Sequence, residues 1–376
     1  MAITIKRDAT TFHKSNPRPT DVPVGSYGAR IMAAQNAAQV QNLVGPTGFK
    51  NHIINGDFRI WQRGTQGTNN TTSGIDSADR WWINKSSGTG YSERYTFTRG
   101  DSLIPGNPSY GIKVNCDTGN NNFGLLQKVE DVRAFMGQYV TLSFWAKGRN
   151  PGGGHFKSSW IRSYTSAGNN GEWTVADNIV LNEEWQFFSF TTKVPNVSGG
   201  QTINDSESYL WVDILRQPGD DTSTTNWDYK LANVQLEFGT QATPFEYRPL
   251  AVEYPLCQRY FLCYPDKQTG GGNHTFGNVW APSTNEICWN PTFPVPMRAE
   301  PNFSISGSWD HIVFRHTNNA SQTFPSSGIN ANQTETTTMN AGIWLSGMSH
   351  GQTTHGVGEL RTLGGNTAHF HLDAEL

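Results

Sequence analysis

Apolar and polar residues alternate with a spacing of two along most of this chain, which is the period of half-buried β-strands. The clearest case is the segment 140–147, where we expect the even-numbered residues from Leu142 to Ala146 to face a core and Ser143, Trp145 and Lys147 to face outward. Further strands are predicted at residues 94–98, 110–114, 185–192 and 209–215, between clusters of Gly, Asn and Pro. This spacing predicts a two-sheet antiparallel sandwich.

Two segments frame this region and are predicted to be the first and last strands of the sandwich. Residues 51–61 carry apolar side chains interrupted by Asn55-Gly56-Asp57, a turn-forming step that a strand tolerates as a bulge. Residues 231–239 alternate between polar and apolar side chains without interruption.

The remaining pattern predicts a three-part organisation within an all-β fold. Residues 1–48 combine an extended, proline-containing start with a weak helix at 27–43, and the Pro46-Thr47-Gly48 step ends this arm. Residues 49–248 form the sandwich, and a short helix at 249–260 opens a second, smaller β-domain at 249–376. Its strands are predicted at residues 275–279, 286–289, 302–306, 311–316, 341–346 and 368–373.

Composition agrees with a β-sandwich and excludes some partners. Charged residues make up only 16% of the chain and aromatic residues 12%, with 13 Trp, as suits sandwiches with many turns. The formal net charge of -3 gives no field that would attract nucleic acid. Residues 1–50 nevertheless hold six Lys or Arg against Asp8 and Asp21. This basic arm suggests docking onto an acidic surface, and a solvated flexible tail is the alternative.

Nothing in the sequence predicts secretion, a membrane span or disulfides. The charged first eight residues precede no apolar core, and no stretch approaches the roughly 20 apolar residues that a membrane span needs. We therefore expect synthesis in a cytoplasm and no membrane insertion. Four cysteines are too few for a disulfide framework in a chain this long, so we expect reduced, buried thiols at Cys116, Cys257, Cys263 and Cys288.

The framing segments resemble those of jelly-roll carbohydrate-binding modules, which open with an Asn-Gly-Asp-Phe step and close on a strand carrying acidic or amide residues. Residues 77–81, 256–260, 297–301 and 371–376 follow one another in an order that resembles bacteriophage tail-fibre or receptor-binding proteins.

This resemblance, which covers roughly residues 49 to 376, implies a virion fibre made in the host cytoplasm that adsorbs to host-surface glycan. It also implies a homotrimer, an N-terminal arm that attaches to other tail or baseplate proteins, and a C-terminal tip domain. A capsid decoration or head fibre protein with the same domains is the alternative. A polysaccharide-degrading tail protein is a third reading.

Sugars stack their apolar faces on aromatic rings, so outward-facing aromatic residues are the candidates for glycan binding. Trp145 and the pair Trp211 and Asp213 are expected outward by strand alternation, while Trp160 and Trp173 are expected in Gly-rich loops. The alternative for each Trp is that it fills the second side of a sandwich or a subunit interface.

Two metal sites are considered. The resemblance implies a structural calcium ion that ties the first strand to the last, with oxygen ligands from Asp57 and from Asp228 or Glu237. Alternatively, Asp57 caps its own turn. His369 and His371 lie on one face of a predicted strand, and three copies around a threefold axis would offer six nitrogens to a transition metal, whereas two solvated histidines are the simpler reading.

Catalysis is not predicted. A glycosidase needs two carboxylates at a defined separation, and no spacing ties Asp213, Glu237, Glu183 or Glu184 into such a pair. We therefore expect a binding protein and not an enzyme.

Overall fold

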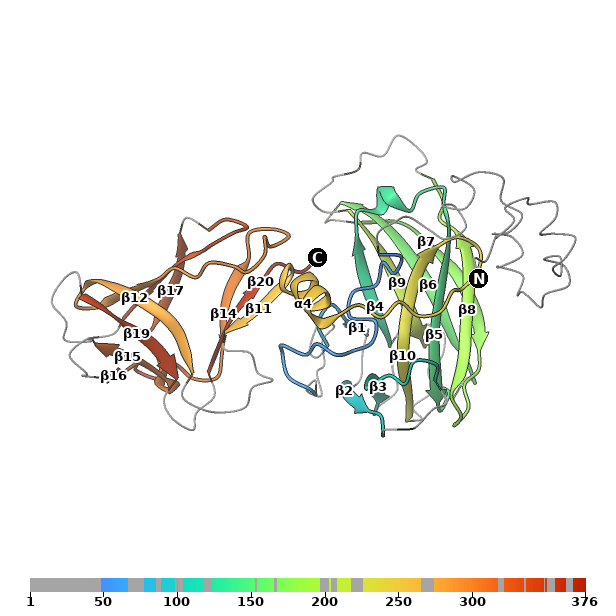
Figure 1. The fold of residues 1–376 in the computed structure, drawn as a ribbon, viewed down its shortest axis with the longest axis horizontal. Coiled ribbons are helices and arrows are strands. Elements are labelled where there is room, and N and C mark those ends of the chain that lie inside the picture. Colours follow the sequence, from blue (N-terminus) through green and yellow to red (C-terminus); the bar gives the residue numbers. More distant parts are fainter. Residues whose placement is uncertain are drawn as a thin grey trace, which may run out of the picture.

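A computed structural model of the chain describes residues 49–376 except 67–77, 86–88, 99, 101–103, 118–122, 153, 166–167, 197–202, 204–207, 218–225, 265–273, 317–320, 335, 348, 350–355 and 363–367. The predicted arm with its helix at 27–43 lies outside the described residues. Figure 1 shows two β-domains side by side, with helix α4 (Leu250–Gln258) between them. The fold is all-β, an antiparallel jelly-roll sandwich followed by a second, smaller β-domain.

The sandwich consists of two five-stranded antiparallel sheets. One sheet has the order β1-β4-β9-β6-β7, formed by Trp82–Asn84, Gly124–Glu130, Tyr209–Arg216, Phe156–Thr165 and Gly168–Ile179. The other, here called the β5 sheet, has the order β2-β3-β10-β5-β8, formed by Gly90–Thr96, Tyr110–Cys116, Trp227–Phe238, Tyr139–Gly148 and Gln186–Lys193.

Strand alternation explains the core between these sheets. On β5, Leu142, Phe144 and Ala146 are fully buried in the shared core, whereas Trp145 and Lys147 on the opposite face are partly exposed, as predicted. The other strands contribute their inward residues in the same way, so one apolar cluster runs from residue 53 to residue 236. Burial of this cluster is the main driving force for folding the sandwich.

The predicted first strand at 51–61 is wrong, because this segment is a series of turns. Asn55 and Phe58 have φ angles of 57° and 56°, which a continuous strand ladder does not allow. The segment still lies against β10, because the backbone N–H of Val234 donates to the Gly56 carbonyl at 2.9 Å. A side chain at Gly56 would bring its Cβ within 2.2 Å of the Val234 oxygen, so only glycine fits this close approach.

The C-terminal domain has two antiparallel sheets with their own apolar core, which runs from Leu262 to Ala374. A three-stranded sheet has the order β11-β20-β14, formed by Phe261–Tyr264, His369–Asp373 and Asn302–Ser306. A seven-stranded sheet has the order β16-β15-β19-β12-β13-β18-β17, formed by Ser321–Thr323, Ile312–His316, Gly356–Thr362, Thr275–Ser283, Glu286–Trp289, Gly342–Ser346 and Asn330–Thr334.

The last residues of the chain join the two domains. Arg80, which is almost fully buried, forms an ion pair with Glu375, and Arg63 lies 3.5 Å from the same carboxylate. The ammonium group of Lys128 on β4 donates to the Leu376 oxygen at 2.6 Å. Buried cations that lack a partner are costly, so these contacts fix the C-terminal segment against the sandwich.

All four cysteines are free and buried, as predicted. Among the described residues, no helix is long and apolar enough to cross a membrane.

Candidate functional site

A cleft of about 680 Å³ lies on the outer face of the β5 sheet. Its floor contains Ser143 and Trp145 from β5, Phe187 from β8 and Asn233 from β10. One wall is the 105–109 loop. The other wall is formed by residues 242–248, a segment that we call the strap. The volume falls within the range of about 300–1,000 Å³ that is usual for ligand pockets.

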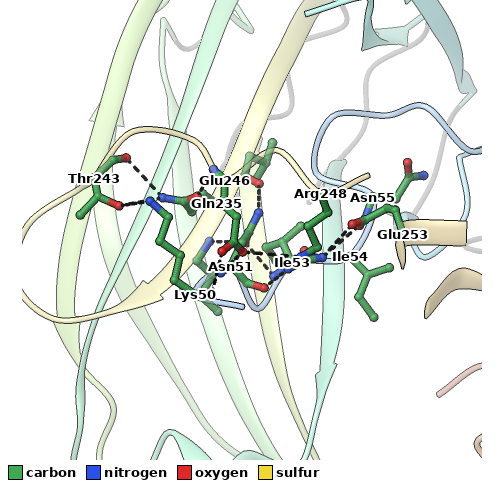
Figure 2. A network of polar contacts seen from close by, with 12 residues as sticks. Lys50, Asn51, Ile53, Ile54, Asn55, Gln235, Thr243, Glu246, Arg248 and Glu253 are labelled. Carbon is green, nitrogen blue, oxygen red and sulfur yellow. Dashed lines mark hydrogen bonds and ion pairs between the residues drawn. The ribbon is translucent and has the colours of Figure 1, made fainter. Parts of the chain in front are cut away.

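A network of polar contacts fixes the strap across the outer face of the sheet (Figure 2). Glu237 on β10 accepts hydrogen bonds from the Thr243 backbone at 2.8 Å and from its hydroxyl at 2.7 Å. Gln235 accepts from the Glu246 backbone at 2.8 Å. The Lys50 ammonium group donates to the Thr243 hydroxyl and to the Pro244 carbonyl, both at 2.6 Å. The wall of the cleft is therefore held from two directions.

A buried ion pair anchors the far end of the strap. Arg248 donates to both carboxylate oxygens of Glu253 on α4, at 3.0 and 3.1 Å, and both side chains are 4% exposed. The same guanidinium also donates to the Asn51 carbonyl (Figure 2). This pair links the strap, the turn-rich segment and the helix, and removal of one partner would leave a buried charge uncompensated.

Asp57 and Arg59 reach the cleft from the turn-rich segment and form an ion pair. The Asp57 side chain is only 8% exposed. Burial raises the pKa of this carboxyl above its ordinary value, and the positive charge of Arg59 opposes that shift only in part. The Arg59 guanidinium also lies over the Tyr247 ring of the strap, 4.4 Å from its centroid.

Aromatic rings provide the apolar part of the cleft. Trp145 and Phe187 are neighbours on adjacent strands, with ring centroids 5.5 Å apart and planes inclined by 51°. Phe187 is 49% exposed and Tyr247 is 67% exposed. These rings give the concavity an exposed apolar surface.

Of the residues predicted to bind glycan, only Trp145 lies in this cleft. Trp160 and Trp173 are on β6 and β7, where they pair in register in a hairpin and not in Gly-rich loops. The expectation that Trp160 is exposed is wrong, because its side chain is fully buried and its indole donates to Ser158 at 3.0 Å. Trp173 is half-buried and packs against the same core, so neither ring presents the free face expected of it.

Trp211 and Asp213 lie on β9 of the other sheet, so they do not belong to the cleft. Asp213 was expected to face solvent and is instead fully buried. Its carboxylate lies 3.3 Å from Arg216, which also pairs with Glu172 at 2.5 Å. Burial raises the pKa of Asp213 to about 7 despite the attraction of Arg216.

In this structure the residues expected to hold calcium have other contacts, and the calcium site stays a prediction. Asp57 pairs with Arg59, Asp228 pairs with Arg149, and Glu237 bonds to the strap. Among the described residues, no group of three or more His, Cys, Asp and Glu side chains could hold a metal ion. Asp57 forms an ion pair with Arg59, and its carboxyl group also interacts with its own backbone N–H, as in the alternative assignment to a cap of its own turn.

His369 and His371 lie on one face of β20, as the alternation predicts, and are half-buried. The His371 ring lies 5.1 Å from the Phe261 ring, and its Nε2 is 3.3 Å from the Ser306 hydroxyl. The threefold metal site built from these histidines stays a prediction.

Sequence reasoning missed Arg59, Phe187 and Tyr247. Phe187 is signalled by its predicted strand, because the register places it beside the outward-facing Trp145. No comparable signal marks Arg59 and Tyr247, which belong to segments without regular structure, and the contacts within the folded chain alone bring them to the cleft.

Comparisons with known proteins give only distant similarities. No family model matches the chain, and no curated protein sequence matches it. Among solved structures, it is similar to the enzymatically active domain of tailspike protein 4 from bacteriophage CBA120, with 17% identity and a TM-score of 0.29 over 50% of this chain. The aligned part spans 21% of that tailspike chain.

Two further similarities are to sugar-binding proteins. A putative sugar binding protein from Bacteroides thetaiotaomicron matches with 14% identity and a TM-score of 0.31, over 50% of this chain and 100% of that chain. The CBM22-2 xylan-binding domain from Paenibacillus barcinonensis Xyn10C matches with 17% identity and a TM-score of 0.30, over 43% of this chain and 92% of that chain. The fold assignment rests on the strand order and register described above.

Proposed function

We propose that this chain is a non-catalytic fibre protein of a bacteriophage virion that binds host-surface glycan through the cleft on the β5 sheet. The observation that carries the proposal is the combination of Trp145, Phe187 and Tyr247 around a concavity of about 680 Å³. Sugars have apolar C–H faces and a rim of hydroxyl groups. Such a ligand needs aromatic surfaces beside fixed polar groups, and this cleft offers both.

Binding without cleavage is favoured by the acidic residues of the cleft. Asp57 is the one carboxylate among the described residues that line it. Hydrolysis of a glycosidic bond normally uses two carboxylates, about 5 to 9.5 Å apart. The polysaccharide-degrading alternative therefore has no support at this site.

The assignment to a tail fibre rests on the order of the sequence motifs at 77–81, 256–260, 297–301 and 371–376. On this proposal the basic residues 1–48 attach the protein to other tail or baseplate proteins, and three copies form a homotrimer. Three linked sites can exceed the affinity of one by roughly 10²–10⁴. A capsid decoration or head fibre protein would use the same cleft at another place on the virion.

The test compares two aromatic substitutions on the same strand. Trp145→Ala removes a ring from the cleft floor, and we expect adsorption to host cells and binding to immobilised host polysaccharide to fall about tenfold. Tyr139→Ala is the matched control, because Tyr139 also lies on β5, is 52% exposed and is not among the residues of the cleft. Equal binding by both variants, with both folded, would refute the proposed site.

A further inference from the structure

An exposed tryptophan lies on a strand of the C-terminal domain. Trp280 on β12 is 39% exposed and is the only exposed tryptophan among the described residues. Its neighbours along the strand, Val279 and Ala281, are buried in the apolar core of the domain. Because successive side chains of a strand point to opposite faces, the Trp280 ring lies on the outer face of the seven-stranded sheet, away from that core.

Strand pairing continues this position into a row across the sheet. Trp280 is the register partner of Val357 on β19 and of Cys288 on β13. Cys288 in turn pairs with Trp344 on β18, and Trp344 pairs with Asn332 on β17. Directly paired residues have their side chains on the same face of the sheet, so we call these five residues the outer row. Adjacent strands are about 4.8 Å apart, which makes the row roughly 19 Å long.

The outer row combines aromatic surface with accessible amides. The rings of Trp280 and Trp344 have centroids 6.1 Å apart and planes inclined by 75°. Val357 beside them is 56% exposed. The exposed Asn332 ends the row, and the exposed Asn278 lies two residues before Trp280 on the same face. An amide both donates and accepts hydrogen bonds, so the rings have groups beside them that can bond to hydroxyls.

The size of the apolar surface favours a small partner over a protein. An aromatic side chain has roughly 150–250 Å² of surface, so at these exposures the outer row offers on the order of 200 Å². A stable protein interface buries about 800 Å² on each partner, with an apolar centre. A chain of sugar rings needs less, because each ring presents one apolar face and binds through its hydroxyl groups at the sides.

The outer row also faces away from the sandwich. Figure 1 shows the three-stranded sheet, with β11, β14 and β20, on the side of the C-terminal domain next to α4 and the sandwich, and the seven-stranded sheet beyond it. The apolar core lies between these two sheets. The outer face of the seven-stranded sheet is therefore directed away from the cleft-bearing domain.

We propose that the outer row is a second glycan-binding surface, on which sugar rings contact Trp280 and Trp344 while amides beside the rings bond to their hydroxyl groups. This inference rests on the function proposed above in that the partner is a glycan, and it adds a contact outside the cleft. The two surfaces lie on different domains, so they act together on a polymeric glycan or on glycans clustered at a cell surface. Linked sites of this kind bind more tightly than either site alone.

The test measures binding of the full-length protein to a panel of immobilised lipopolysaccharides and capsular polysaccharides from several bacteria. Trp280→Ala removes the exposed ring of the outer row, and Trp145→Ala removes the ring of the cleft floor. Met339→Ala is the matched control, because Met339 is also a large apolar side chain of the C-terminal domain, is 44% exposed and lies outside the outer row.

We expect Trp280→Ala to weaken binding to the polysaccharides that the unmodified protein binds by about fivefold or more, and Met339→Ala to leave it unchanged. The double variant Trp145→Ala/Trp280→Ala should bind more weakly than either single variant. Hydroxyl-radical footprinting of the unmodified protein should show protection of Trp280 and Trp344 by bound polysaccharide, with the oxidation of Met339 unchanged. This readout needs no substitution, so it decides the question even if Trp280→Ala fails to fold.

The outcomes separate this inference from the proposed function. Binding that falls with Trp145→Ala and is unaffected by a folded Trp280→Ala, without protection of Trp280, would overturn the inference and leave the cleft standing. The reverse pattern would support the outer row and refute the cleft. A changed mass of the Trp280→Ala assembly in light scattering would identify this face as a subunit interface and overturn the inference. If the unmodified protein binds no member of the panel, both proposals fail.

Discussion

The tryptophans of the sandwich take different roles because each strand has two faces. Trp145 on β5 faces outward and reaches the cleft, whereas Trp160 on β6 is fully buried between the sheets. Trp173, its register partner, packs at the edge of the same core and donates to Thr192 at 3.2 Å. The same residue type therefore contributes to recognition at one position and to stability at another.

Substitution of Trp160 should expose this difference. Trp160→Ala removes a fully buried ring that contacts the shared core, so we expect the free energy of unfolding to fall by about 3–5 kcal/mol. Trp145→Ala, whose ring is partly exposed, should lower it by no more than about 1–2 kcal/mol. Urea unfolding followed by circular dichroism measures both values. Equal losses would contradict the assignment of the two faces.

Asp213 links the stability of the sandwich to pH. Its pKa is raised to about 7 from 3.8, mainly by burial, so the folded state binds the proton more tightly than the unfolded state does. The contribution of the protonated group to stability is complete below about pH 4. It is lost as the pH rises through about 7.

Asp213→Asn removes this titration and keeps the size of the side chain. As the pH rises from 4 to 8, we expect the stability of the variant to improve relative to the unmodified protein by on the order of 2–4 kcal/mol, since one pKa unit corresponds to about 1.4 kcal/mol. Chemical denaturation of both proteins at several pH values gives the difference. A difference that is constant with pH, or that moves in favour of the unmodified protein, would refute this role for Asp213.

At the scale of elements, the regular strands were predictable from the sequence. The turn-rich segment and the strap, which form part of the cleft, were not. The strand at 286–289 and that at 302–306 appear at the predicted positions, because their apolar residues recur with a period of two. The β6–β7 hairpin was missed, since Gly-rich and polar residues obscure its period, and several register shifts interrupt its pairing.

The turn-rich segment shows why the site itself was harder to predict. The sequence predicts Asn55-Gly56-Asp57 as a bulge within a strand, but the positive φ at Asn55 and Phe58 turns the chain, and Asp57 lines the cleft. The strap is fixed by side-chain contacts from residues almost 200 positions away, such as Lys50 to Thr243. Local sequence patterns do not encode such contacts, because they depend on the tertiary fold.

The strap should depend on Lys50 and not on calcium. Lys50→Met removes two hydrogen bonds to the strap, and we expect a loss of about 1–2 kcal/mol in the free energy of unfolding together with weaker glycan binding. Lys193→Met is a control, because Lys193 is remote in sequence from the strap and lies near the exposed Tyr139 ring.

Addition of EDTA or calcium should leave the melting temperature of the unmodified protein unchanged. A rise of several degrees with calcium would show that an ion site exists.

At the scale of the whole molecule, the two domains share polar contacts that order the C-terminal segment. Glu375 pairs with Arg80 and Arg63 of the sandwich side, and the Arg80 guanidinium also lies 3.5 Å from the centroid of the Tyr260 ring. On β4, Glu130 accepts hydrogen bonds from Arg259 and from the Tyr260 hydroxyl. These contacts tie the cleft-bearing domain to the C-terminal domain.

The proposed fibre is a homotrimer, and this is tested by light scattering on the full-length protein. We expect a mass of about three times 41.7 kDa at micromolar concentration, because weak single-site affinities become useful when three sites act together. A stable monomer of the full-length protein would contradict the fibre proposal, and the threefold histidine site would fall with it.

A protein without residues 1–48 should keep its glycan binding and lose attachment to the virion.

The central claim is that the cleft on the β5 sheet holds the sugar. The most direct measurement is a crystal structure of the protein with an uncharged oligosaccharide that it binds in solution. The account predicts a sugar ring in the cleft, against Trp145 and Phe187. A sugar bound elsewhere, for example over the exposed Trp280 of the C-terminal domain, with the cleft empty, would contradict it.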